Sequence, residues 1–304
     1  MRNTMTHTTP DNFLGLDQQY STLETSKVVV LPIPFEATVS YGGGTVNGPS
    51  AIIEASQQVE FYDREFDTEP AKNWGVHTLP SVEVNDQDPD SAMQSIAQAV
   101  EATARLGKLV CVLGGEHSVS GAVAQGLHAV HGDFVTVQID AHADLRDQYE
   151  GSKHSHACAM HRILDVGAGD LLQLGIRSLD ISEAHMIKTD PRITTFYSEH
   201  VHDGLHLPAL RDFVRGKQVY FTIDIDGLDV GLVPATGTPE PDGLTWREVL
   251  EITRILVQES AKVVAFDIME LAPIENLHSP NFVSAKLTYK VMSIIMAKQA
   301  DLWQ

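Results

Sequence analysis

Short apolar runs alternate with helical segments along most of the chain, and this alternation limits the possible folds more than any other feature. The runs have the length of buried strands and lie at residues 27–31, 108–113, 134–139, 171–176, 193–196, 218–223 and 262–268. Apolar spacing predicts helices at residues 51–60, 91–106, 156–165, 207–214, 244–258 and 280–299. Strands buried on both faces and connected by helices form mostly parallel sheets, so we expect an α/β protein.

Local signals set several of these boundaries. Pro32 is expected to end the first strand, because proline has no amide hydrogen to donate. Pro49 is expected to open the first helix, and Gly107 to end the helix at 91–106. Thr245 and Glu248 have the spacing of a capping box at the start of a later helix.

No linker or internal repeat divides the sequence. Its 304 residues, 43% of them hydrophobic, suffice for one large core. We therefore expect a single domain over residues 27–304, preceded by an N-terminal arm at residues 1–26 with the apolar segment 13–16 as its anchor.

The composition excludes several classes of partner and location. Lys and Arg number 21 against 41 Asp and Glu, a formal charge of −20. This balance argues against nucleic acid, whose phosphates need clustered basic residues, and suits a small cationic substrate. No apolar run reaches about 18 residues, so no membrane span is expected. The polar start lacks a signal peptide's apolar core, and Cys111 and Cys158 form no disulfide framework. We expect a cytoplasmic protein.

A glycine-rich segment at residues 40–45 is expected to form a loop of unusual backbone shape. A phosphate-binding loop is the alternative, but the lysine and hydroxyl residue that end such a loop are missing.

The acidic pentapeptide Asp140-Ala-His-Ala-Asp144 closes the apolar run at 134–139. In an extended backbone, Asp140, His142 and Asp144 project from one face. Two carboxylates and an imidazole are costly to bury together unless a cation lies between them. The pentapeptide alone is also compatible with a solvated strand end.

Other acidic or histidine residues follow two further strands, where ligand sites of parallel sheets lie. His117 follows the run at 108–113, and Asp224 and Asp226 follow the run at 218–223. Separately, His117 could cap a helix, and the two aspartates could form a turn with Gly227. Together with the pentapeptide they predict a metal site.

Four aspartates and two histidines are too many ligands for one ion and fit two divalent ions. The oxygen-rich set without cysteine favours Mn²⁺, and the histidines leave Ni²⁺, Co²⁺, Fe²⁺ and Zn²⁺ open. Such ions lower the pKa of bound water to about 7 in favourable cases.

Three ordered motifs resemble those of the ureohydrolase family of arginases and agmatinases. They are Gly114-Gly-Glu-His-Ser118, Asp140-Ala-His-Ala-Asp144 and Thr222-Ile-Asp-Ile-Asp-Gly-Leu-Asp229, and the similarity extends from residue 41 to residue 273. The resemblance implies a three-layer α/β/α fold with a central, mainly parallel eight-stranded sheet, and a homotrimer or homohexamer. It also implies two metal ions, one held by His117, Asp140, Asp144 and Asp224, the other by Asp140, His142, Asp224 and Asp226.

The implied reaction is hydrolysis of a guanidinium group to urea and an amine by a hydroxide derived from metal-bound water. His156 is expected to give the leaving amine its proton, with His154 as the rival for this role. Asp226 is expected to hold the proton of the nucleophile, and Glu270 to pair with the guanidinium.

The substrate tail is expected to lie against the loop at residues 145–154. The sequence of this loop resembles that of agmatinases. Agmatine, the expected substrate, would then give putrescine, and Glu150 or Asp147 could receive its ammonium. Guanidinobutyrate would instead require Arg146 or Lys153, and free guanidine no tail site. Arginine is a further alternative substrate. The alternative to an enzyme is a non-catalytic relative that binds metal.

Overall fold

One eight-stranded sheet forms the centre of the protein, and every strand pair in it is parallel. The computed structural model describes residues 11–300, whose strands lie in the order β2-β1-β3-β8-β7-β4-β5-β6. Their bounds are β1 Val28–Ile33, β2 Val76–Thr78, β3 Leu109–Gly114, β4 Val135–Ile139, β5 Leu171–Ile176, β6 Ile193–Tyr197, β7 Gln218–Asp224 and β8 Lys262–Met269. The predicted α/β architecture is confirmed.

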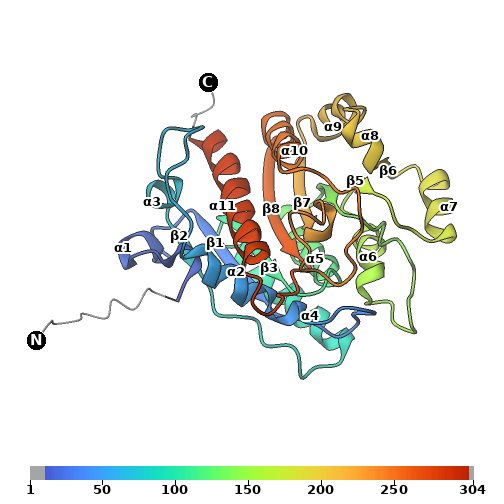
Figure 1. Cartoon of the computed structure of the whole chain (residues 1–304), viewed down its shortest axis with the longest axis horizontal. Coiled ribbons are helices and arrows are strands. Elements are labelled where there is room, and N and C mark those ends of the chain that lie inside the picture. The colour runs from blue at the N-terminus through green and yellow to red at the C-terminus, as the bar shows by residue number, and fades with distance from the viewer. Residues whose placement is uncertain (1–10, 301–304) are drawn as a thin grey trace, which may run out of the picture.

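Helices cover both faces of this sheet and make three layers (Figure 1). Their bounds are α1 Gln18–Ser21, α2 Gly48–Ser56, α3 Pro70–Trp74, α4 Pro89–Ala104, α5 Val119–His131, α6 Ala159–Val166, α7 Ile181–Thr189, α8 Ser198–His202, α9 Leu207–Val214, α10 Trp246–Glu259 and α11 Ser279–Gln299. Residues of α2, α9, α10 and α11 share one apolar core, and residues of α4, α5 and α6 share the other. Val30 and Leu31 belong to different cores, because successive strand residues face opposite ways.

Two predicted boundaries were wrong. β1 continues through Pro32 to Ile33, because the neighbouring strand β2 has already ended and the Pro32 carbonyl accepts from the Val82 amide of the following segment instead. The first long helix ends at Ser56 rather than at residue 60, because the amides of Gln57 to Val59 bond three residues back in tight turns. The helices α7 and α8 had not been predicted.

Other predicted signals hold. Gly107 lies just after α4 with a positive φ of 69°, and Pro49 lies in the first turn of α2. Thr245 and Glu248 form the expected capping box of α10. The segment predicted as a helix from residue 156 begins with a 3-10 turn, His156–Cys158, before α6.

The described part of the N-terminal arm packs against the main body. Phe13 and Leu14 are buried, and their amides donate to Thr78 Oγ1 at 2.9 Å and Ser56 Oγ at 2.7 Å. Residues 1–10 of the predicted arm lie outside the described residues. The division into an arm and one domain stays a prediction.

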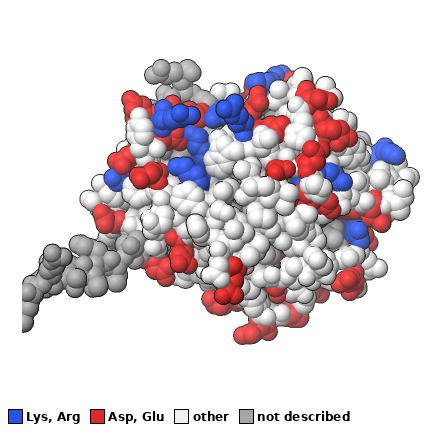
Figure 2. All heavy atoms as spheres, in the orientation of Figure 1, with Lys and Arg blue, Asp and Glu red and all other residues white. Residues whose placement is uncertain are grey.

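The acidic composition is visible at the surface of the molecule. Acidic side chains are spread over the face in Figure 2, and basic ones are fewer. Within residues 11–300, no helix combines the length and apolar character needed to cross a bilayer.

Candidate metal centre and active site

The predicted metal ligands and Glu270, the predicted guanidinium-binding residue, lie at the ends of four strands that are neighbours in the sheet, β3, β8, β7 and β4. His117 follows β3 and Glu270 follows β8. Asp224 ends β7, and the pentapeptide 140–144 follows β4. Parallel strands end at the same edge, so all these residues reach one place.

The local backbone differs from the extended form expected. Asp224 is the last residue of β7, and Asp226 lies in the 3-10 turn Ile225–Gly227, where its amide donates to Asp224 Oδ1 at 2.9 Å. After β4, the chain turns, and Asp144 takes a φ of 52°. A turn therefore brings these side chains together. The left-handed backbone of Asp144 costs about 1 kcal/mol, because this conformation is unfavourable for a residue other than glycine.

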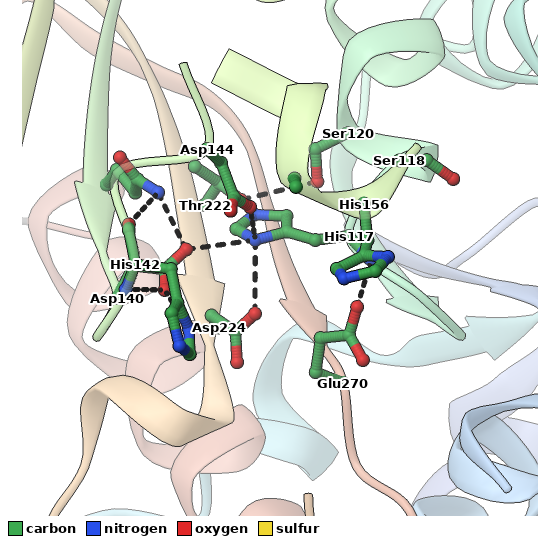
Figure 3. A network of polar contacts seen from close by, with 12 residues as sticks. His117, Ser118, Ser120, Asp140, His142, Asp144, His156, Thr222, Asp224 and Glu270 are labelled. Atoms are coloured by element: carbon green, nitrogen blue, oxygen red, sulfur yellow. Dashed lines mark hydrogen bonds and ion pairs between the residues drawn. The ribbon is translucent and has the colours of Figure 1, made fainter. Parts of the chain in front are cut away.

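His117 lies at the centre of three carboxylates (Figure 3). Its Nδ1 is 3.0 Å from Asp140 Oδ2, 3.2 Å from Asp144 Oδ2 and 3.1 Å from Asp224 Oδ2. On the opposite edge of the ring, Nε2 lies 2.9 Å from Thr222 Oγ1. With the ring proton on Nε2, the lone pair of Nδ1 faces three acceptors, and Nδ1 is a buried atom without a hydrogen-bond partner.

This arrangement fits a divalent cation. Adjacent ligands of an octahedral ion with bonds of about 2.1 Å lie about 3 Å apart, which is the spacing around His117 Nδ1. The atoms of His117, Asp140 and Asp224 are close enough to share an ion. The residues present therefore suit a hard or borderline metal.

A second possible metal group shares Asp140 with the first and adds His142 and Asp226. His142 Nδ1 lies 3.0 Å from Asp226 Oδ2 and 3.8 Å from Asp140 Oδ1. Asp226 Oδ1 accepts the Ala141 amide at 3.1 Å. The sharing of Asp140 agrees with a bridging carboxylate between two ions.

The carboxylates of the cluster compete for positive charge. Burial, with the nearby charges of Asp144 and Asp226, raises the pKa of Asp140 to about 7. Burial, together with the nearby charges of Asp226 and Asp140, also raises the pKa of Asp224 well above its ordinary value. Such groups are stabilised when cations replace the protons they attract.

The imidazoles respond in the opposite sense. Burial disfavours their charged forms, yet the surrounding aspartates raise the pKa of His117 well above its ordinary value. At His142, burial lowers the pKa, but the nearby aspartates, chiefly Asp226, outweigh it and raise the pKa of His142 to about 11. In return, burial raises the pKa of Asp226, but His142 outweighs it and lowers the pKa of Asp226 to about 2. The cluster therefore has an excess of negative charge.

A narrow pocket opens beside these ligands, with a volume of about 20 Å³. About 10–15 Å³ of such space holds one water molecule. His142, Asp144, Asp224, Asp226, His156 and Glu270 line it together with parts of the segments 39–42 and 237–238. The predicted catalytic residues thus share one pocket with four of the six predicted ligands.

The two rival histidines lie in different places. His156 lines the pocket and, in Figure 3, lies beside the ligand cluster. His154 Nε2 instead pairs with Asp90 Oδ1 at 2.7 Å, on the side of a separate cleft. The geometry favours His156 as the residue that can reach a substrate.

Glu270 has a positive φ of 64° and is buried. Its Oε1 accepts the His117 amide at 2.6 Å, which leaves Oε2 for a ligand. Burial and the nearby charge of Glu116 raise the pKa of Glu270 well above its ordinary value. A bound cation would relieve this unfavourable burial of charge.

Glu116 holds the segment that carries Thr38 over the pocket. Its carboxylate accepts the amides of Ala37 and Thr38 at 2.7 and 2.6 Å and the Thr38 hydroxyl at 2.8 Å. Thr38 Oγ1 in turn accepts the His156 amide at 3.0 Å. Glu116 therefore fixes His156 through Thr38, a role that the sequence motif did not reveal.

The glycine-rich segment is a wall of the pocket and not a phosphate cradle. Glu36 accepts the amides of Gly44 and Val46 and the Thr45 hydroxyl at 2.8–3.0 Å. A side chain of the protein thus occupies these donors. A Cβ on Gly42 would lie 2.9 Å from the Gly237 carbonyl, so a larger residue would not fit where the two segments meet.

A wider cavity of about 180 Å³ continues from the pocket and is lined by Arg146, Tyr149 and Glu183, among others. Arg146 lies over the Tyr149 ring at 4.5 Å. Glu183 accepts the amides of Leu145 and Asp180 at 2.8 and 2.6 Å. Glu183 was missed from the sequence, because it comes from a helix that was not predicted.

The other tail residues considered lie elsewhere. Asp147 pairs with Arg162 at 2.7 Å, and Lys153 lies in the cleft with His154. Glu150 is exposed and does not line the cavity. Of the four tail residues considered, only Arg146 lines this cavity.

Comparison with known proteins agrees with this geometry. The sequence model of the arginase family matches residues 26–294. An N(1)-aminopropylagmatine ureohydrolase of Synechocystis sp. is 38% identical over 271 residues, covering 87% of this chain and 88% of the relative. An agmatinase of Halalkalibacterium halodurans is 31% identical over 258 residues, covering 83% and 86%. The crystal structure of an agmatine ureohydrolase of Thermoplasma volcanium superposes with a TM-score of 0.79 at 27% identity, covering 97% of both chains.

Proposed function

Because the chain belongs to the arginase family, we propose that it hydrolyses the guanidino group of a linear amine to urea and the free amine, with agmatine as substrate. The observation that carries this proposal is the His117 imidazole surrounded by three carboxylate oxygens at 3.0–3.2 Å. His156 and Glu270 line the same pocket, so acid–base and guanidinium-binding groups accompany the ligands.

The proposed cofactor is a pair of Mn²⁺ ions, with Ni²⁺ and Co²⁺ as alternatives. One ion would be held by His117, Asp140, Asp144 and Asp224, and the other by Asp140, His142, Asp224 and Asp226. Four carboxylates formally balance two divalent ions. When bound, such ions lower the pKa of a water molecule and supply the hydroxide that attacks the guanidinium carbon.

Glu270 is proposed to hold the guanidinium. Its Oε1 is fixed by the His117 amide, so Oε2 can accept a charge-assisted hydrogen bond from the substrate. The low dielectric of the buried position strengthens this pair. Glu270 therefore orients the carbon toward the ligand cluster.

His156 and Asp226 are proposed to handle the proton. Asp226 Oδ2 lies at the pocket beside His142, where it can accept a hydrogen bond from the attacking water and hold its proton. His156 then gives a proton to the departing amine, which leaves poorly as an anion. An imidazole suits this step because it gains and loses protons near pH 7.

The substrate tail is proposed to lie in the wider cavity. The carboxylate of Glu183 and the aromatic face of Tyr149 can attract an ammonium group, but Arg146, whose Nε lies 3.7 Å from Glu183 Oε2, partly opposes it. The surplus of 20 negative charges over the whole chain favours approach of a cationic substrate.

N1-aminopropylagmatine is a second candidate. A relative carrying that name has 38% identity, and the agmatinase of Halalkalibacterium halodurans has 31%. The cavity of about 180 Å³ also offers room for a longer tail. The two substrates share the guanidino end and differ only beyond the first amine.

We propose that the enzyme acts in polyamine biosynthesis in the cytoplasm and forms putrescine from agmatine. We also propose that it assembles as a homotrimer or homohexamer.

The test is urea release by the metal-loaded protein from agmatine, N1-aminopropylagmatine, arginine, guanidinobutyrate and guanidine. We expect the two linear amines to be the best substrates, and the ratio of their kcat/KM values identifies the preferred one. Absence of urea from all five, with two metal equivalents bound, would instead indicate a non-catalytic relative.

A further inference from the structure

A row of polar side chains crosses the sheet beneath the ligand cluster. Register partners on five neighbouring strands form it in the order Thr195, Gln173, Gln138, Thr222 and Asp267. All except Thr195 are completely buried. Gln138 and Thr222 lie two residues before Asp140 and Asp224, hence on the same face of their strands.

Hydrogen bonds run along one arm of this row toward Asp140. The Thr195 hydroxyl donates to Gln173 Oε1 at 2.8 Å, and Gln173 Nε2 donates to Gln138 Oε1 at 2.7 Å. Gln138 Nε2 then donates to Asp140 Oδ2 at 2.6 Å and to the His142 carbonyl at 3.3 Å. This series of hydrogen bonds links the edge strand β6 to Asp140, the residue proposed to be shared by both ions.

The orientation of both amides follows from their surroundings. Gln138 Nε2 faces a carboxylate and a carbonyl, neither of which can donate. Gln173 Nε2 likewise faces the Ala143 carbonyl at 2.7 Å. If either amide were reversed, its oxygen would face two other hydrogen-bond acceptors in a buried site, which would lower the stability of the protein. Gln138 can therefore only act as a donor toward the cluster.

We propose that Gln138 is a positioning residue that orients Asp140 for two metal ions, an inference that rests on the metal centre of the proposed function. Asp140 Oδ1 accepts the His142 amide at 2.7 Å, and Oδ2 accepts from Gln138. Each oxygen thus has one fixed hydrogen bond and keeps lone-pair capacity for an ion. Gln138 sets the plane of the carboxylate before metal arrives.

A neutral amide suits this position. Asp140 lies within 3.0 Å of His117 and belongs to a cluster of four aspartates. A glutamate in place of Gln138 would add a fifth carboxylate at hydrogen-bond distance from Asp140. An apolar residue would leave one of the two N–H groups of the Gln173 amide without an acceptor, while the other still donates to the Ala143 carbonyl. Groups that orient a metal ligand in this way typically contribute 10- to 100-fold in metal affinity.

The test compares Gln138→Met, Gln138→Asn and the control Gln218→Met. Gln218 is the first residue of β7 and is half-buried. Its amide donates to the His131 and Asp133 carbonyls at 3.0 and 3.2 Å, away from the cluster. Asparagine keeps an amide but is too short to reach Asp140. Affinities for both Mn²⁺ ions are measured by competition with a fluorescent chelator, alongside the EPR spectrum of the manganese pair and the melting temperature of the metal-free protein.

We expect both Gln138 variants to bind at least one ion about 10- to 100-fold more weakly and to change the EPR spectrum, whereas Gln218→Met lowers only the melting temperature. Folded Gln138 variants with the affinities and spectrum of the unmodified protein would overturn the proposal. If Gln138→Met does not fold, Gln138→Asn decides. Failure of the unmodified protein itself to bind two ions would instead contradict the proposed function.

Discussion

The carboxylate of Glu270 accepts the backbone amide of His117 at 2.6 Å, although 153 residues separate them. This hydrogen bond joins the end of β8 to the turn after β3, which are neighbouring strands. The group proposed to hold the substrate and a proposed metal ligand are therefore fixed relative to each other.

Glu270→Gln should separate substrate binding from metal binding. Glutamine keeps an oxygen for the His117 amide but loses the charge that pairs with a guanidinium. We expect kcat/KM for agmatine to fall about 100- to 1000-fold, the effect of breaking a buried charge pair, with two metal equivalents retained. Glu275→Gln, on the same loop and exposed, is the control; unchanged kinetics in Glu270→Gln would refute the role.

His156→Asn should remove the proton donor and leave the metals in place. General acid–base groups typically contribute 10²- to 10⁴-fold, so we expect kcat to fall in that range. His154→Asn serves as the control and should retain most of the activity, since His154 pairs with Asp90. The reverse outcome would assign the role to His154.

Thr38→Val should disturb His156 without touching the ligands. Valine has a similar shape but cannot accept the His156 amide or donate to Glu116. The loss of such hydrogen bonds costs about 1 kcal/mol each, so we expect a five- to tenfold lower kcat with unchanged metal content. Thr189→Val, which removes a hydroxyl from the exposed end of α7, should have no effect; equal kcat in both variants would exclude the link through Thr38.

Asp224→Asn should lower metal content. The aspartate is buried, 3.1 Å from His117 Nδ1, and an amide is a poorer ligand than a carboxylate for a divalent ion. Elemental analysis should find fewer than two equivalents per chain. Asp229→Asn is the control, because Asp229 accepts only a turn amide at 2.9 Å; two equivalents in Asp224→Asn would contradict a bridging role.

Glu65 should make stability depend on acid pH. Arg254 and Lys290 outweigh burial and lower the pKa of Glu65 to about 2, below an unfolded value near 4.3. Its contribution to the free energy of unfolding is therefore complete above about pH 5 and declines as the pH falls toward 2. Denaturant unfolding at pH 6 and pH 3 should show a smaller pH dependence in Glu65→Gln than in the unmodified protein. Glu101→Gln, from an exposed helix pair with Arg105, should leave the dependence unchanged.

The sequence allowed the layers and the residues of the proposed metal cluster to be predicted, because strand length and residue position are local properties. The runs ending near Ile139 and Ile223 placed Asp140 and Asp224 at one edge of the sheet. Contacts between distant segments could not be inferred in this way. Glu183 arrives from α7, and Thr38 reaches His156 across 118 residues.

Gln138 and Thr222 illustrate a signal that was present but unused. Each is a polar residue inside an apolar run, on the same strand face as a ligand two positions later. Buried polar side chains need partners, so this pattern indicates support for the ligand. Their partners, Gln173 and His117, depend on strand order, which the sequence alone did not provide.

The most direct test of the proposed chemistry is a titration of the metal-free protein with Mn²⁺, with bound metal and urea release from agmatine measured on the same samples. We expect no urea without metal and maximal release as binding approaches two equivalents per chain. Full activity without metal, or no urea from a protein holding two ions, would contradict a binuclear ureohydrolase.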